Sequence, residues 1–176
     1  AVRRESWQEA QGFLSRILLV RRDAEILQDA YLVERGLGNN AKALAYAKEL
    51  YDRGVSNDEY IAVYISALID NDRRGDASRM LEKFLSAPAG AAAKSRYFFL
   101  RSRLQEDEEA AYNDLLSSLF ENPRNLEALI AMFEIYHRRH EERRAVYYLK
   151  QALALAPGNS RIKRYEAEYA SLLGKE

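Results

Sequence analysis

The side chains with the most evident capacity for chemistry are His137 and His140, the only histidines in the chain of 176 residues. At i, i+3 spacing on a helix end, with Glu134 and Glu141 nearby, they could ligate a divalent metal ion. A polar turn between two helices uses histidine equally well, and we favour that interpretation. We therefore assign no metal ligand and no cofactor. A metal- or small-ligand-binding accessory domain is the least favoured function.

The other common catalytic patterns are missing from the sequence. The chain has no cysteine, which excludes disulfides, thiolate zinc sites and cysteine nucleophiles. No serine has the context of a nucleophile elbow. Gly36 and Gly38 lack the Lys-Ser/Thr continuation of a phosphate-binding loop. We therefore expect a protein that is not an enzyme.

The charge balance argues against two kinds of partner. Lys plus Arg and Asp plus Glu each number 27, so there is no basic excess for nucleic acid or a membrane surface. Neighbouring acids neutralise the arginine pairs at 73–74, 138–139 and 143–144, which we interpret as solvated turns. The longest apolar run, from Phe13 to Val20, is too short and too polar to insert across a bilayer. A chain without cysteine suits the cytoplasm and a bacterial periplasm or envelope equally, so the localisation stays open.

The elements that position these residues repeat along the chain. Ala43, Ala77, Ala111 and Ala145 are spaced 34 residues apart, and Pro123 and Pro157 keep the same interval. A fixed period of this size indicates one supersecondary unit copied several times. The units are residues 24–57, 58–91, 92–125 and 126–159, and each divides into two helical stripes.

Physical reasons support the helical reading of each unit. Asn57, Asn125 and Asn159 fall where a following helix should begin, as N-cap residues do. The periodic alanines allow two antiparallel helices to approach closely near their connecting turn. A core between repeats is expected at four apolar positions that share the same period: Tyr51, Leu85, Leu119 and Leu153.

The pattern resembles the tetratricopeptide repeat family. The fourth unit matches its motif best, and the first unit supplies the family's Gly before the second helix as Gly38. The matching residues of the fourth unit are Leu129, Met132, Tyr136, Ala145, Ala152 and Pro157. The chain departs from the motif at four positions. Phe133 stands where the family prefers a small residue, and Asp72 stands where it prefers a glycine. Val55 and Ala89 stand in place of the closing prolines of the first two units.

The resemblance implies an all-α helical-repeat solenoid of antiparallel helix pairs, with about ten helices in a single domain over residues 1–176. Residues 1–23 would form an N-terminal helix, and residues 160–176 a capping helix. The N-terminal segment is interpreted either as a dimerising helix or as the second helix of a truncated earlier repeat. In the second case, further repeats would precede Ala1 in the full protein.

In this family the first helices of the repeats line a concave groove that receives an extended peptide or a partner protein. The resemblance thus implies a groove, carried over by register, formed by Gln28, Arg35, Glu59, Ser66, Asp70, Arg96, Leu100, Arg103, Glu127, Glu134, His137 and Arg138. Gln28 and Leu32 occupy the places of the family's carboxylate clamp, so that clamp is not expected. Arg96 and Arg103 could recognise an acidic or phosphorylated segment, or simply pair with neighbouring glutamates; both alternatives stay open.

We therefore predict a non-catalytic protein–protein interaction module or scaffold. The alternative is a self-associating structural module, hence a homo-oligomer, joined through the stripe of Trp7 or through a face formed by Tyr165 and Tyr169.

Overall fold

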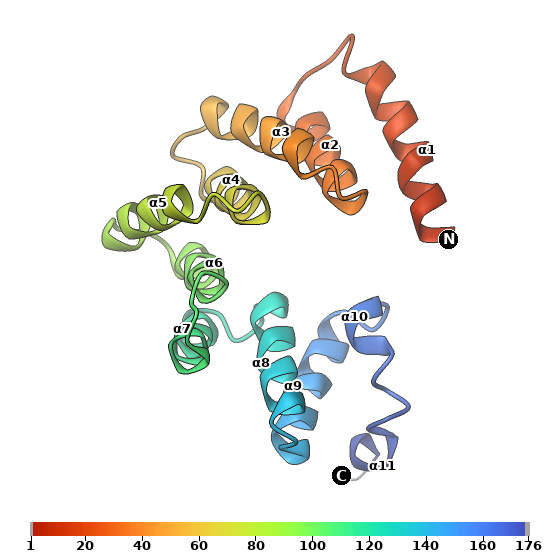
Figure 1. Cartoon of the computed structure of the whole chain (residues 1–176), viewed down its shortest axis with the longest axis vertical. Coiled ribbons are helices and arrows are strands. Elements are labelled where there is room, and N and C mark those ends of the chain that lie inside the picture. The colour runs from red at the N-terminus through yellow and green to blue at the C-terminus, as the bar shows by residue number, and fades with distance from the viewer. Residues whose placement is uncertain (1, 175–176) are drawn as a thin grey trace. The chain divides into compact units, whose positions relative to one another are not determined.

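The computed structural model describes residues 2–174, and the side chains from Ser6 to Gly174. These residues form eleven helices and no strand (Figure 1). The helices are α1 Val2–Ile17, α2 Ala24–Gly36, α3 Asn40–Arg53, α4 Asp58–Asp70, α5 Arg74–Ser86, α6 Ala91–Ser102, α7 Glu108–Glu121, α8 Leu126–Arg138, α9 Glu142–Leu155, α10 Ser160–Lys163 and α11 Ala170–Leu173. The predicted fold class, all-α with antiparallel helix pairs in tandem, is confirmed.

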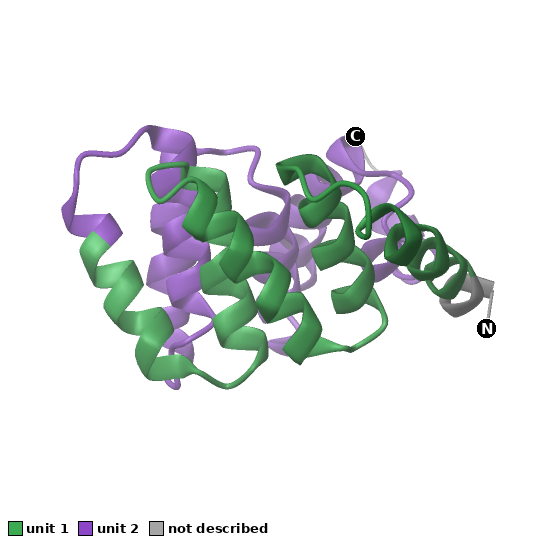
Figure 2. Cartoon of the chain, turned by 90° about the horizontal axis from the view of Figure 1, so that it is seen from above, with its two compact units in different colours: residues 1–83 green, residues 84–176 purple. Residues whose placement is uncertain are grey.

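The chain divides into two compact units, residues 1–83 and residues 84–176 (Figure 2). In the first unit, α1 packs on α2, α2 on α3 and α3 on α4. In the second unit, α6 packs on α7, α7 on α8 and α8 on α9, while α10 and α11 pack on α9. Close contact between consecutive helices is the arrangement of a helical repeat in each unit. The expected single domain and its repeat boundaries stay a prediction.

Short polar side chains begin four of the nine long helices that the structure describes. The side-chain oxygens of Asp23, Asn57, Asp107 and Asn125 each accept a hydrogen bond from a backbone N–H in the first turn of the next helix, and Asn159 does the same for α10. These bonds satisfy donors that a helix start otherwise leaves without a partner. The capping predicted for the three asparagines is confirmed.

Buried residues in the second helices follow the 34-residue period, although one turn earlier than expected. Ala43, Ala77 and Ala145 are buried. One turn further along each second helix, a line of almost fully buried side chains consists of Ala47, Leu81, Leu115 and Leu149. The predicted core positions Tyr51, Leu85, Leu119 and Leu153 are only half-buried, although Leu119 and Leu153 do pack against the core of the second unit. The core therefore lies nearer the turn that connects the two helices of each repeat than the sequence predicts.

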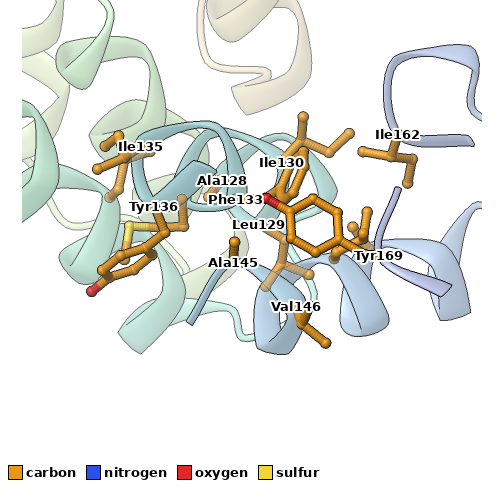
Figure 3. Packing of buried hydrophobic residues seen from close by; sticks show 14 residues of the cluster. Ala128, Leu129, Ile130, Phe133, Ile135, Tyr136, Ala145, Val146, Ile162 and Tyr169 are labelled. Carbon is orange, nitrogen blue, oxygen red and sulfur yellow. The ribbon is translucent and has the colours of Figure 1, made fainter. Parts of the chain in front are cut away.

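The largest core cluster belongs to the second unit and centres on α8. Leu129, Ile130 and Phe133 are fully buried against Ala145 and Val146 of α9, and Ile162 and Tyr169 close the cluster from the C-terminal segment (Figure 3). Full burial of one such aliphatic or aromatic side chain contributes about 1.5–3 kcal/mol. This cluster fixes the positions of α8, α9 and α10.

The C-terminal segment differs from the expected single capping helix. It forms two four-residue helices, α10 and α11, joined by turns in which Tyr165 N donates to Ile162 O (2.9 Å) and Glu166 N to Lys163 O (3.2 Å). These i→i+3 bonds tighten the chain. The rings of Tyr165 and Tyr169 then both contact Phe133, at centroid distances of 4.8 and 5.9 Å. The tyrosine face expected to join subunits is therefore used in packing within the chain.

Candidate binding surface

Two polar contacts hold the first helices α2 and α4 of the first unit side by side. Gln28 Nε2 donates to Glu59 Oε1 at 2.8 Å, and Arg35 Nε donates to Asp70 Oδ2 at 2.7 Å. These four residues, all predicted groove residues, thus come together on one surface. Arg35 stays partly exposed, and pairs of this kind contribute about 0–1 kcal/mol, so they align the helices more than they stabilise them. Ser66, predicted beside them, is buried.

The same surface carries one exposed apolar side chain. Leu32 is 46% exposed and lies four residues after Gln28 and three before Arg35, hence on the same face of α2. We name Gln28, Leu32 and Arg35 of α2, with Glu59 and Asp70 of α4, the α2–α4 face. An apolar centre with a polar rim is the usual anatomy of a protein-binding surface. Leu32 is not among the predicted groove residues, since in the sequence it stands at a place of the family's carboxylate clamp.

In the second unit, Arg161 of α10 forms ion pairs with the two predicted groove glutamates of α8. Its Nη1 donates to Glu127 Oε2 and its Nη2 to Glu134 Oε1, both at 2.9 Å. Burial lowers the pKa of Arg161, but its hydrogen bonds and charge interactions with Glu134 and Glu127 outweigh this effect, and the pKa lies above its usual value. The carboxylates of α8 are therefore already matched within the chain. Arg161 is not among the predicted groove residues, although it lies one repeat period after Glu127.

The predicted residues of α6 differ in accessibility. Leu100 is buried, so its side chain belongs to the core of the second unit. Arg103 is half-buried. Arg96 is exposed and makes no hydrogen bond or ion pair with any residue that the structure describes. Among the predicted arginines, Arg96 is the one available to an acidic ligand.

His137 lies in an aromatic cluster. Its Nδ1 is 2.7 Å from Tyr169 Oη, and its ring stacks on Phe133 with centroids 5.6 Å apart. Tyr165 meets the same imidazole edge-on at 4.8 Å. His140 lies outside this cluster, in the α8–α9 turn. In the described part of the chain, no group of three or more acidic, histidine or cysteine side chains could hold a metal ion.

The predicted residue Arg138 is held by α7. Arg138 Nη2 and Arg139 Nε both donate to the carboxylate of Glu108, at 3.0 and 2.8 Å. The two hydrogen bonds keep the pKa of Glu108 below its usual value. The pair therefore links the end of α8 to the start of α7.

Comparison with known proteins finds a likeness in structure but none in sequence. No protein-family model matches the chain, and no curated protein matches it. Among solved structures, the chain is similar to one described as the crystal structure of MamA protein, with 17% sequence identity and a TM-score of 0.49; the match covers 85% of this chain and 84% of that one. None of the helices in the described residues is long and apolar enough to cross a membrane.

Proposed function

We propose that the protein is a non-catalytic interaction module of the tetratricopeptide type. It binds an extended peptide or a partner helix on the first helices of its repeats. The 34-residue period, the burial of three of the four periodic alanines and the asparagine caps support the repeat type. Surface recognition needs only the aligned helices, and among the described residues the geometry singles out no reacting group.

The observation that carries this proposal is the α2–α4 face. Leu32 exposes its side chain between two polar contacts that fix neighbouring first helices. Covering such an aliphatic side chain with a ligand contributes favourably to the free energy of binding. The surrounding polar groups can hydrogen-bond a peptide backbone at the rim. We therefore place Leu32 at the centre of the binding surface, with Gln28 and Arg35 setting ligand orientation.

A peptide selection tests the proposal. We would pan a phage-displayed library of random peptides on the intact protein and measure the selected peptides by fluorescence anisotropy. We expect Leu32→Glu to weaken binding by about tenfold or more, because central contacts dominate such interfaces. Val55→Glu is the matched control, because Val55 is also an exposed aliphatic residue of the first unit but lies in the α3–α4 turn. Equal affinity of both variants for the selected peptides would contradict the proposal.

A further inference from the structure

The inner face of α1 is already used within the first unit. Trp7 lies so close to Gly36 that a Cβ on Gly36 would come within 2.8 Å of the indole ring. Gln11 Nε2 donates to both carboxylate oxygens of the buried Glu34, at 2.9 and 3.0 Å. Leu18 packs in the core with α2 and α3. The Trp7 stripe expected as a dimerising surface therefore faces α2.

The opposite side of α1 is apolar and exposed. Phe13 is 66% exposed, Ile17 39%, Leu19 87% and Val20 86%. Of the nine exposed large hydrophobic side chains in the described part of the chain, four fall within residues 13–20. A concentration of this kind marks a surface that another molecule covers, whereas single exposed leucines do not. We name Glu9, Gly12, Phe13, Arg16 and Ile17, with the following Leu19 and Val20, the α1 outer face.

The α1 outer face is not purely apolar, because it also carries the exposed charged side chains of Glu9 and Arg16. An apolar helix packed here would bury both charges without matching them, which is strongly unfavourable. The covering partner must therefore offer opposite charges at both positions.

A second copy of the same helix meets this requirement. Glu9 and Arg16 lie seven residues apart on one face, roughly 10 Å along the axis. Within the described residues, neither side chain makes a hydrogen bond or ion pair. If two α1 helices lie antiparallel about a twofold axis between Gly12 and Phe13, Glu9 of each copy meets Arg16 of the other. Gly12 has open space around it, so it can accept the Phe13 ring of the second copy.

We propose that two copies of this chain associate through their α1 outer faces, as an antiparallel helix pair with a Phe13–Gly12 contact at its centre and two Glu9–Arg16 pairs. This interface is isologous, as expected for a twofold dimer. With four exposed apolar side chains on each copy, we expect a small and weak interface, with a dissociation constant on the order of 1–100 µM. The α2–α4 face takes no part in it.

Sedimentation equilibrium of the purified chain between about 1 and 200 µM tests the association, which mass action makes concentration-dependent. We expect the average mass to rise from 20.3 kDa for the monomer toward twice that value. Phe13→Asp should abolish the rise. Phe120→Asp is the matched control, because Phe120 is also an exposed phenylalanine but lies on α7, and it should leave the rise unchanged. A mass that stays at the monomer value throughout, or a dimer insensitive to Phe13→Asp, would overturn the proposal.

Charge exchange tests the antiparallel register. Glu9→Arg places two arginines opposite each other at both ends of the pair, and Arg16→Glu places two glutamates there. Each single variant should weaken association about tenfold or more, and the double variant Glu9→Arg/Arg16→Glu should restore it. Circular dichroism and melting curves check that every variant is folded. Failure of the double variant to recover association would overturn the proposed pairing.

Discussion

At the scale of single residues, Asn125 connects three helices of the second unit. Its Oδ1 caps α8 by accepting from Ala128 N at 3.3 Å. Its Nδ2 donates to the hydroxyls of Ser95 on α6 and Ser118 on α7, at 2.9 and 3.0 Å. Both serines are fully buried, and Ser118 Oγ also donates to Ser95 O at 2.8 Å. The cap therefore also joins the α6–α7 pair to α8.

We expect Asn125→Ala to lower the free energy of unfolding by about 2 kcal/mol, because it removes a cap and leaves two buried hydroxyls short of a donor. Asn159→Ala is the control, since the Asn159 side chain only caps α10, through Arg161 N at 2.9 Å. That variant should lose about 1 kcal/mol. Urea denaturation measures both. Equal losses would show that the buried serines do not depend on Asn125.

The hydroxyl of Tyr136 gives the fold a dependence on alkaline pH. Burial, with a hydrogen bond to Tyr112 Oη at 3.0 Å, raises the pKa of Tyr136 to about 12. In the unfolded chain the same group ionises near pH 10. The stabilisation is therefore fully present below pH 10 and is lost as the pH rises through 12.

Denaturation curves at intervals between pH 9 and 12 should consequently show a falling free energy of unfolding, with a smaller fall for Tyr136→Phe. Tyr147→Phe controls for the loss of one hydroxyl, because that ring is largely exposed. A slope that is the same in Tyr136→Phe and the native protein would mean that other groups cause the loss.

At the scale of elements, three of the turns within the repeats share a left-handed backbone position. Gly38 has φ 80°, Asp72 φ 58° and His140 φ 56°, and these residues are one and then two repeat periods apart. Left-handed backbone costs a non-glycine residue roughly 1–2 kcal/mol, whereas glycine adopts it freely. Asp72 and His140 therefore hold strain that Gly38 avoids.

His140→Gly should raise the free energy of unfolding by about 1 kcal/mol, since the strain relieved exceeds the extra entropy of glycine in the unfolded chain. His140→Ala keeps a Cβ at the left-handed position and should give no gain. Thermal melts monitored by circular dichroism separate the two variants. A melting temperature of His140→Gly below that of the native protein would contradict backbone strain at His140.

The helices were predictable from the sequence, whereas several contacts between them were not. The period and the asparagine caps gave the positions of the long helices because both depend on nearby residues. The role of Arg161 depends on α10 lying beside α8, and no local sequence pattern indicates this contact. The break after Lys163 likewise follows from the packing of two tyrosines on Phe133, a contact across some thirty residues. Helical register placed Ser66 and Leu100 in the groove because it does not tell how far a neighbouring helix covers a side chain.

At the scale of the whole molecule, the chain offers two surfaces with different chemistry. The α2–α4 face has one apolar residue framed by polar contacts, which suits a peptide ligand. The α1 outer face has four apolar residues and two unmatched opposite charges, which suits a second copy of itself. Because the two surfaces lie on different helices, self-association and ligand binding should be separable by substitution.

The most direct test of the interaction proposal is to map a selected peptide onto the protein by NMR. Backbone amide shifts of the ¹⁵N-labelled chain would be followed during titration with that peptide. We predict that the largest changes fall on α2 and α4, around Leu32 and Asp70, and that Leu32→Glu removes them. Changes confined to the second helices of the repeats, or changes that persist in Leu32→Glu, would contradict binding on the first helices.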